Sequence, residues 1–156
     1  MQLKKIVSGG QTGVDRAALD AALRHGIAAG GWCPAGRRAE DGEIPDRYPL
    51  EELPFSDYGA RTEKNVIDSD ATLILNLGDL ADGTRLTVDL AQKYCKPHYV
   101  VQLEEEADPA AAAAWLRAQG VRTLNVAGPR ESKRPGVYAC ALRFMERLLA
   151  EGFSTC

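Results

Sequence analysis

The sequence predicts a three-layer α/β/α domain built on a mainly parallel five-stranded sheet. Short apolar, β-branched runs alternate with amphipathic stretches at helical spacing, and glycines mark several of the junctions between them. Such alternation is typical of right-handed βαβ units, whose helices cover both faces of a parallel sheet. The chain has 156 residues, a length that suits one hydrophobic core, so we expect a single domain over residues 1–156.

The N-terminal part predicts two strands, a helix and a long loop. Residues 4–8 are β-branched and apolar, and from residue 14 apolar positions recur at helical spacing until Gly26. Residues 27–32 resume an extended pattern. Prolines and charges then argue against regular structure over much of residues 33–57. Because loops longer than about 12–15 residues are often functional, we expect this loop to form the wall or lid of a site.

The rest of the chain completes the alternation. In order, the pattern predicts a helix over 58–68, a strand over 71–77 and a helix that follows Gly83 and Thr84 and ends at 94. A strand over 97–103, an alanine-rich helix ending at 119 before Gly120, a strand over 121–126 and a helix over 138–149 come next. The third strand is the most apolar stretch, which indicates a central position. For a Rossmann-like sheet of five strands we expect the order 2-1-3-4-5, with the ligand site where the winding reverses, between strands 1 and 3.

Composition excludes several kinds of partner. The formal net charge of −3 argues against binding nucleic acid by bulk electrostatics, so an anion site has to be local. No run approaches the roughly 18–20 apolar residues that span a bilayer, and the N-terminus lacks the apolar core of a secretory signal. We therefore expect a soluble cytoplasmic protein with a small anionic ligand and with neither nucleic acid nor membrane as partner.

The cysteines argue against a zinc site. Cys33, Cys95, Cys140 and Cys156 are widely scattered, no pair has CxxC spacing, and two histidines accompany them. We expect Cys95 and Cys140 to be small buried hydrophobic residues.

Residues 8–16 predict an anion site where the first strand gives way to a helix. Their glycines allow close backbone approach, and the free amides that open a helix carry about half a positive charge, which favours a phosphate. The spacing is neither GxGxxG nor a Walker A loop, so a glycine-rich turn with Asp15 completing the helix start is the alternative. We assign Asp15 to that helix start or to a ligand hydroxyl.

Two further segments follow strands. Residues 76–84 open a helix at Gly83 and Thr84, and together with residues 8–16 they predict a paired anion cradle. The alternative is that Asp82 caps this helix while Gly83 relieves strain. Residues 128–133 follow the fifth strand and bring Arg130 to the same edge of the sheet.

Arginines concentrate in these strand-end segments, and their planar donors suit phosphate. They are Arg16, Arg37, Arg38, Arg61, Arg85 and Arg130. A solvated surface explains any one of them, but less readily their common position. Trp32 stands near two of them and is either a platform for a flat heterocycle or part of the core.

Several of these segments, taken in order, resemble the molybdenum-cofactor carrier proteins, which are Rossmann-like relatives of the lysine-decarboxylase-like (LOG-type) phosphoribohydrolases. They are SGGQTGVDR at 8–16, GWCP at 31–34 with GRRAEDG at 36–42, RTEKNV at 61–66, DGT at 82–84 and NVAGPRES at 125–132. The resemblance implies a homo-oligomeric carrier, a dimer or tetramer, that binds the molybdenum cofactor, shields it and passes it to apo-molybdoenzymes. It also implies that any metal is held by the pterin.

The sequence departs from the phosphoribohydrolase branch at one position. That branch has a catalytic glutamate three residues after the threonine of its glycine motif, and here the position is Thr87. Since Arg61 matches an arginine of that branch, a nucleoside monophosphate hydrolase that uses Glu63 or Asp89 instead is one alternative to the carrier. A nucleotide-sensing domain is the other.

We therefore predict a ligand carrier with no catalytic residue and no metal ligand from the chain. Glycines and threonines of the strand-end loops would cradle the phosphate while arginines supply charge. The predicted ligand-binding residues are Gly9, Gly10, Gln11, Thr12, Gly13, Arg16, Arg37, Arg38, Arg61, Asn65, Gly83, Thr84 and Arg130.

Overall fold

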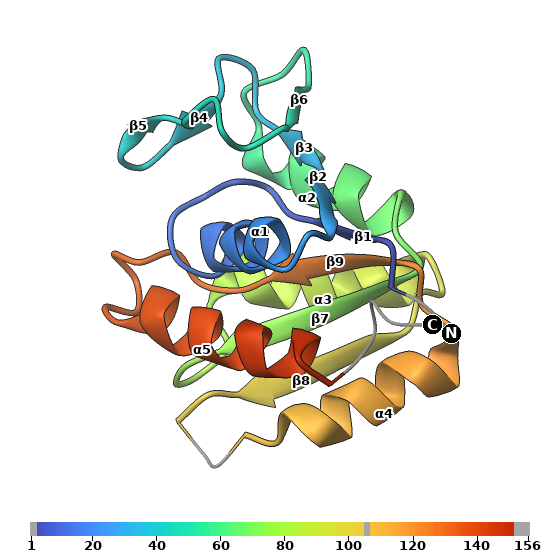
Figure 1. The fold of residues 1–156 in the computed structure, drawn as a ribbon. Coiled ribbons are helices and arrows are strands. Elements are labelled where there is room, and N and C mark those ends of the chain that lie inside the picture. Colours follow the sequence, from blue (N-terminus) through green and yellow to red (C-terminus); the bar gives the residue numbers. More distant parts are fainter. Residues whose placement is uncertain (1–2, 105–106, 152–156) are drawn as a thin grey trace.

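Five parallel strands form the centre of the molecule, which the computed structural model describes over residues 3–104 and 107–151. They are β1 (Lys5–Val7), β2 (Ala28–Gly30), β7 (Ala71–Asn76), β8 (His98–Gln102) and β9 (Thr123–Ala127). Their order across the sheet is β2-β1-β9-β7-β8, and all neighbours run parallel (Figure 1). The predicted five-stranded parallel sheet is confirmed.

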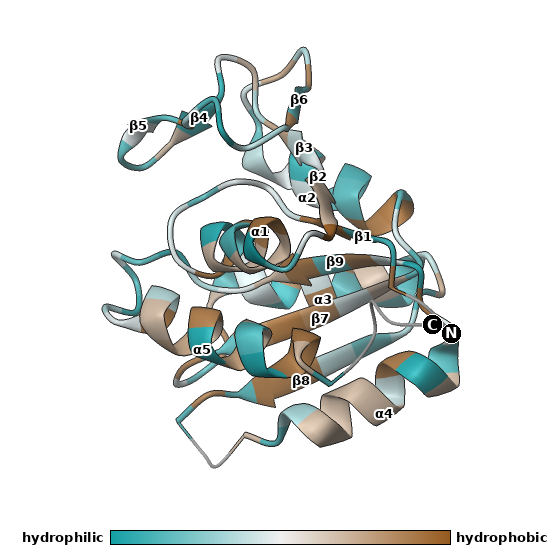
Figure 2. Cartoon of the chain, in the orientation of Figure 1, coloured by the Kyte–Doolittle hydropathy of each residue, from teal (hydrophilic) through white to brown (hydrophobic). Residues whose placement is uncertain are grey.

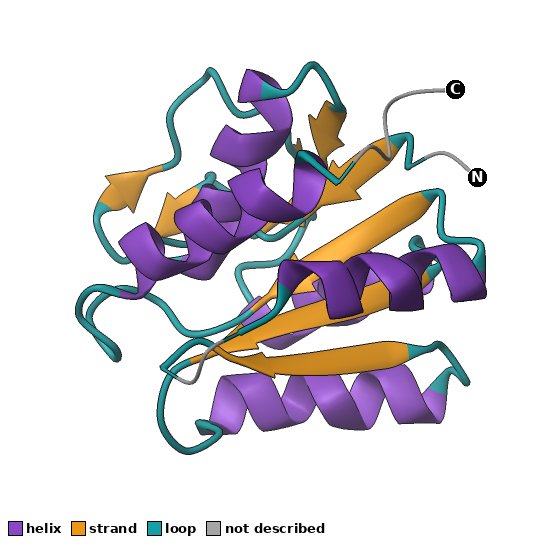
Figure 3. Ribbon diagram, turned by 60° about the horizontal axis from the view of Figure 1, so that its bottom comes forward, coloured by secondary structure: helices purple, strands orange, loops and turns teal. Residues whose placement is uncertain are grey.

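Helices cover both faces of this sheet. They are α1 (Val14–Arg24), α2 (Tyr58–Ile67), α3 (Asp82–Lys93), α4 (Pro109–Gln119) and α5 (Val137–Leu149). α1 and α4 both pack against α5 on one face, and α2 packs against α3 on the other, which gives the predicted three layers (Figure 3). Within the described ranges, no helix is long and apolar enough to cross a membrane.

The expected strand order 2-1-3-4-5 is wrong at one point. β9, the last strand along the chain, lies between β1 and β7, where Asn125 pairs with Val7 on one side and with Thr72 on the other. β7 and β9 are both largely buried and apolar. The sequence of such a strand does not indicate which parallel strand lies beside it. The loop that follows β9 is therefore placed between the loops that follow β1 and β7.

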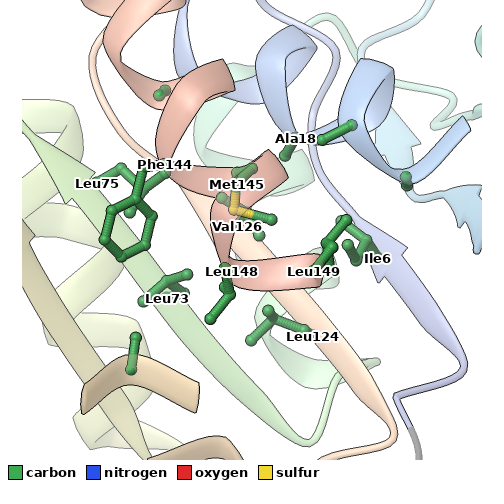
Figure 4. Packing of buried hydrophobic residues seen from close by; sticks show 14 of the residues in the cluster. Ile6, Ala18, Leu73, Leu75, Leu124, Val126, Phe144, Met145, Leu148 and Leu149 are labelled. Carbon is green, nitrogen blue, oxygen red and sulfur yellow. The ribbon is translucent and has the colours of Figure 1, made fainter. Parts of the chain in front are cut away.

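The main core lies between the sheet and the layer formed by α1, α4 and α5. Met145 and Leu148 of α5 pack over the sheet residues Leu75, Leu124 and Val126, and all five are at most 1% exposed (Figure 4). Apolar residues dominate the central strands (Figure 2). Burial of each large side chain contributes about 1.5–3 kcal/mol to the stability of the fold. This packing fixes the strands at whose carboxyl ends the candidate site lies.

The long segment over residues 33–57, called the strap below, is ordered by short pairings. β3 (Trp32–Cys33) pairs in parallel with β6 (Glu51–Glu52), while β4 (Arg38–Ala39) and β5 (Gly42–Glu43) form a hairpin apart from the main sheet (Figure 1). A second small core fixes the strap to α1. It consists of Leu19, Cys33, Ile44, Tyr48 and Leu50.

Arg37 ties the strap together from inside. Its guanidinium donates hydrogen bonds to four backbone carbonyls, those of Ile44 (3.1 Å), Pro45 (2.8 Å), Tyr48 (2.9 Å) and Leu50 (3.2 Å). Five donors on a rigid fork suit such a cluster of acceptors. The side chain predicted to bind a ligand is thus engaged with the strap's own backbone.

Replacing Arg37 by alanine is expected to lower the free energy of unfolding by about 2 kcal/mol, because several strap carbonyls lose a charged donor. Limited proteolysis should then cut the strap faster, and chemical denaturation should show the loss of stability. The matched control is Arg38→Ala, since the neighbouring side chain is exposed. Equal behaviour of the two variants would show that the carbonyl cluster does not depend on Arg37.

The cysteines do not lie where the sequence placed them. Cys95 and Cys140 are exposed, so the expectation that they are buried is wrong, whereas Cys33 is fully buried in the strap core. Cys95 falls in the turn after α3 with φ 54°, and Cys140 is on the outer side of α5. Burial raises the pKa of the Cys33 thiol, which keeps it protonated and unreactive. Cys156 lies outside the described residues.

Candidate functional site

A cleft opens at the carboxyl ends of β1, β9 and β7. Its volume is about 240 Å³, somewhat less than the roughly 300–1,000 Å³ of most ligand pockets. The residues that line it come from the loops after these strands and from α2 and α3. They are Gly9, Gln11, Asp15, Tyr58, Gly59, Arg61, Thr62, Asn65, Ala81, Gly83, Thr84, Leu86, Thr87, Asn125, Val126, Ala127, Gly128, Arg130 and Lys133.

The start of α3 presents free backbone amides to this cleft. Within the described part of the chain, the amides of Asp82, Gly83 and Thr84 have no hydrogen-bond acceptor, and no side chain caps the helix. Ala81 holds the N-cap position, so the alternative that Asp82 caps the helix is wrong. Unpaired amides at a helix start carry a partial positive charge, so this end of the cleft is suited to an anion.

The start of α1 is different, because the chain satisfies much of it internally. The Gln11 amide donates to the Asp15 carboxylate (3.2 Å), the Thr12 amide to the Gln11 side-chain oxygen (3.1 Å) and the Val14 amide to the Pro129 carbonyl (3.2 Å). Asp15 therefore completes the helix start, which is one of the two roles that the sequence predicted for it. Of the two helix starts in the expected paired cradle, the start of α3 is the one that the chain leaves open.

Arg61 and Asp15 form an ion pair in the wall of the cleft. The Arg61 Nη1 lies 3.1 Å from the Asp15 Oδ2, and the two side chains are 15% and 4% exposed. Burial raises the pKa of Asp15, and the Arg61 charge opposes that rise. The Arg61 Nε is buried and has no hydrogen-bond partner among the described residues. A buried donor without a partner is costly, so this atom calls for an acceptor from outside the chain.

Gly9 makes this position of Arg61 possible. A Cβ atom at Gly9 would lie only 1.8 Å from the Arg61 Nη1. The residue is therefore required for close approach of the guanidinium to the first loop, which explains one of the glycines in residues 8–16.

Asn65 also lines the cleft, but its amide is used for structure. Its side chain accepts from the Trp32 amide (2.8 Å) and donates to the Trp32 carbonyl (3.1 Å), which joins α2 to β3. The Trp32 indole donates to Asp68 (2.8 Å) and is only half buried outside the cleft lining. Neither of the two roles considered for Trp32, ligand platform or core residue, matches this placement.

Four predicted residues contact the tip of the β4–β5 hairpin, and two of them, Gln11 and Arg130, also line the cleft. The Glu40 carboxylate accepts hydrogen bonds from the hydroxyls of Thr12 and Ser132 and from the Ser132 amide (3.2 Å). The Arg130 Nε lies 3.3 Å from the same carboxylate as an ion pair. Glu40 and Asp41 are called the acidic tip below.

Gln11 and Arg16 hold the other side of the acidic tip. The Gln11 side-chain oxygen accepts from the Glu40 amide (2.8 Å). Arg16 makes a two-pronged contact with the Asp41 carboxylate (2.5 and 2.8 Å) and donates to the Gly10 carbonyl (3.0 Å). The tip thus places two carboxylates against residues expected to bind an anion.

Other predicted site residues lie outside the cleft lining. Gly10 and Gly13 have φ values of 78° and 81° and shape the loop before α1. The Arg37 guanidinium is hydrogen-bonded to backbone carbonyls of the strap, and Arg38 is exposed. No residue of the strap lines the cleft, so the expected wall or lid is not formed by it.

Some lining residues were missed by sequence reasoning. Tyr58, Thr87, Asn125 and Lys133 line the cleft, and Asn125 donates to the Thr72 hydroxyl (3.2 Å) in the buried middle of β9. The available signal for Asn125 was an amide side chain flanked by the apolar residues Leu124 and Val126. The two carboxylates considered for hydrolysis lie elsewhere. Glu63 accepts from Tyr94, and Asp89 is exposed.

Comparison with known proteins agrees with this architecture. The model of the Circularly permutated YpsA SLOG family matches residues 6–149. A crystal structure from Syntrophus aciditrophicus SB named "Putative molybdenum carrier protein" is 46% identical, covers 94% of this chain and 95% of its own, and superposes with a TM-score of 0.89. None of the curated proteins matches significantly.

Circular permutation accounts for the unexpected place of β9. If the chain began at β9, the order β2-β1-β9-β7-β8 would read 3-2-1-4-5, as in a Rossmann sheet. The winding then reverses between β9 and β7, and the cleft lies there, at the position where ligands bind in such sheets. With a family model that spans most of its length, the chain belongs to the circularly permutated YpsA SLOG family.

Proposed function

We propose that the protein is a carrier for a phosphate-bearing pterin or nucleotide-like ligand, with the molybdenum cofactor as the leading candidate, which it shields and delivers to apo-molybdoenzymes. The observation that supports this most is the pairing of free amides at the start of α3 with the unpartnered Arg61 Nε in one cleft. The name of the relative from Syntrophus aciditrophicus supports the choice of ligand.

The residues of the cleft suit the parts of such a ligand. Amides at Gly83 and Thr84 with the Arg61 guanidinium would hold a phosphate. The polar side chain of Asn125 and the ring of Tyr58 would face a flat, hydrogen-bonding heterocycle. Within the described residues no group of three His, Cys, Asp or Glu could hold a metal, so the molybdenum would be bound by the dithiolene of the cofactor.

The substitution Gly83→Asp is expected to weaken binding of inorganic phosphate by about tenfold or more, because a carboxylate at the helix start repels the anion. A Cβ at Gly83 meets nothing within 4 Å, so the new side chain fits without a clash. Isothermal titration of the purified protein with inorganic phosphate, and then with isolated cofactor, measures the effect. Gly83→Asn is the matched control of equal size without charge.

Three outcomes separate the carrier from its rivals. Saturable cofactor binding without turnover supports a carrier, and unchanged phosphate binding by Gly83→Asp contradicts the proposed site. Release of free base from nucleoside monophosphates, followed by chromatography, would favour a hydrolase, for which Asp15 is the carboxylate that lines the cleft in the described part of the chain. A ligand-dependent change of mass in light scattering would favour a sensor and would also report the oligomer.

A further inference from the structure

The acidic tip fills a site whose composition suits phosphate. The Glu40 carboxylate is bound by two hydroxyls, one backbone amide and one arginine, which come from the loops before α1 and after β9. Hydroxyls, amides and guanidinium groups are the donors that bind phosphate oxygens in proteins. The group that occupies this phosphate-like site is therefore the Glu40 carboxylate, an anion of the chain itself.

The contact between Glu40 and Arg130 is incomplete. The Arg130 Nε is buried and makes no hydrogen bond within the described residues, although the carboxylate lies 3.3 Å away. Three buried side-chain polar atoms lack a hydrogen-bond partner in the described part of the chain, and two of them are the Nε atoms of Arg61 and Arg130 in the lining of the cleft. A carboxylate has two oxygens, whereas a phosphate monoester offers three, enough to reach this remaining donor.

The tip is not what holds the strap in place. The strap is anchored by the hydrogen bonds of Arg37 and by the small core that contains Tyr48 and Leu50. The β4–β5 hairpin stands apart from the main sheet (Figure 1) and is strongly hydrophilic (Figure 2). The tip can therefore move away while the rest of the strap stays folded.

The site of the tip adjoins the cleft. Gln11 and Arg130 line the cleft and also contact Glu40. Removal of the Glu40 carboxylate would extend the cleft, whose present volume is below that of most ligand pockets. The charge of this carboxylate is retained at neutral pH. Although burial alone would raise the pKa of Glu40, the hydroxyls of Ser132 and Thr12, the Ser132 amide and Arg130 outweigh it and lower the pKa.

We propose that Thr12, Arg130 and Ser132 form a second anion subsite, which Glu40 fills in the free protein and a second phosphate group of the ligand fills in the complex. This inference rests on the proposed function, because it makes the full ligand one with two phosphate groups, the first at the start of α3. A doubly charged phosphate interacts more strongly with the Arg130 guanidinium than the singly charged Glu40 carboxylate does, while Arg16 is paired with Asp41.

Counting phosphate sites tests the proposal. Equilibrium dialysis with inorganic phosphate is expected to find one site per wild-type chain and two per Glu40→Ala chain, because the truncation vacates the subsite without filling it. Glu43→Ala removes an equal charge from the same hairpin, at an exposed position, and is expected to keep one site. Thermal unfolding of each variant verifies that it is folded.

Further variants assign each site. In the Glu40→Ala background, Arg130→Ala should remove the second phosphate and Gly83→Asp the first. A count of one for Glu40→Ala, or a second site that survives Arg130→Ala, overturns the proposal. A wild type without phosphate whose Glu40→Ala variant gains one Arg130-dependent site would support the subsite while contradicting the proposed function.

The wild-type protein provides an independent measurement. Saturating inorganic pyrophosphate is expected to speed amide hydrogen exchange in residues 38–43, because the Glu40 amide of the displaced tip no longer donates to the Gln11 side chain. Unchanged exchange in this hairpin overturns the proposal even where the Glu40→Ala variant does not fold.

Discussion

Replacing Gly13 by alanine is expected to lower the free energy of unfolding by about 3 kcal/mol or more. Gly13 has φ 81° and ψ −129°, which L side chains rarely adopt and which costs of order 1–3 kcal/mol for other residues. In addition, a Cβ would lie 2.4 Å from the Pro129 carbonyl and 2.8 Å from the Glu131 amide. Both neighbours are backbone atoms, so the loops before α1 and after β9 would have to separate. Urea denaturation measures the loss.

Gly26→Ala is the matched control for this prediction. Gly26 also has a positive φ, 69°, but a Cβ there meets nothing within 4 Å. Its substitution is expected to cost only about 1 kcal/mol, which is the conformational part alone. The difference between the two variants isolates the clash with the loop after β9. Equal losses would show that the two loops yield readily and that their packing does not hold the site.

The helices and strands of the main sheet were predictable because their signals are local. The strand predicted over 71–77 is observed as Ala71–Asn76, and Gly120, with φ 63°, ends α4 as expected. The neighbours of β9 were not predictable from such signals. A fully buried strand has an apolar run whatever its partners, and the permuted order depends on contacts between distant parts of the chain.

The residues of the candidate site were predictable where the backbone fold alone brings them to the cleft. They were less predictable where other groups of the chain compete for the same hydrogen-bond donors. Gly83, Thr84 and Arg61 reach the cleft, since strand ends and helix starts converge there in any parallel sheet. Arg37 does not, because carbonyls of the strap satisfy its donors once the strap has folded. The role of Glu40 left no signal in the sequence, since a carboxylate is not expected among anion-binding residues.

Arg61→Ala is expected to weaken binding of inorganic phosphate roughly 10- to 100-fold. A hydrogen bond to a charged group contributes about 1.5–3 kcal/mol, and the Arg61 Nε is a buried donor without a partner in the cleft. Isothermal titration at constant ionic strength measures the change. The matched control is Arg85→Ala, an exposed arginine in the first turn of α3 that is not in the cleft lining and donates to the Leu80 carbonyl.

Loss of Arg61 also leaves Asp15 buried without its cation, and breaking such a pair costs about 3–5 kcal/mol. The double variant Arg61→Ala with Asp15→Asn separates this structural effect from binding, since it removes both charges. It should regain stability but not phosphate affinity. Asp15→Asn alone should bind phosphate more tightly than the wild type, because the Arg61 charge is then uncompensated. If the double variant bound phosphate as well as the wild type, Arg61 would serve only to neutralise Asp15, and the anion would depend on the amides of α3 alone.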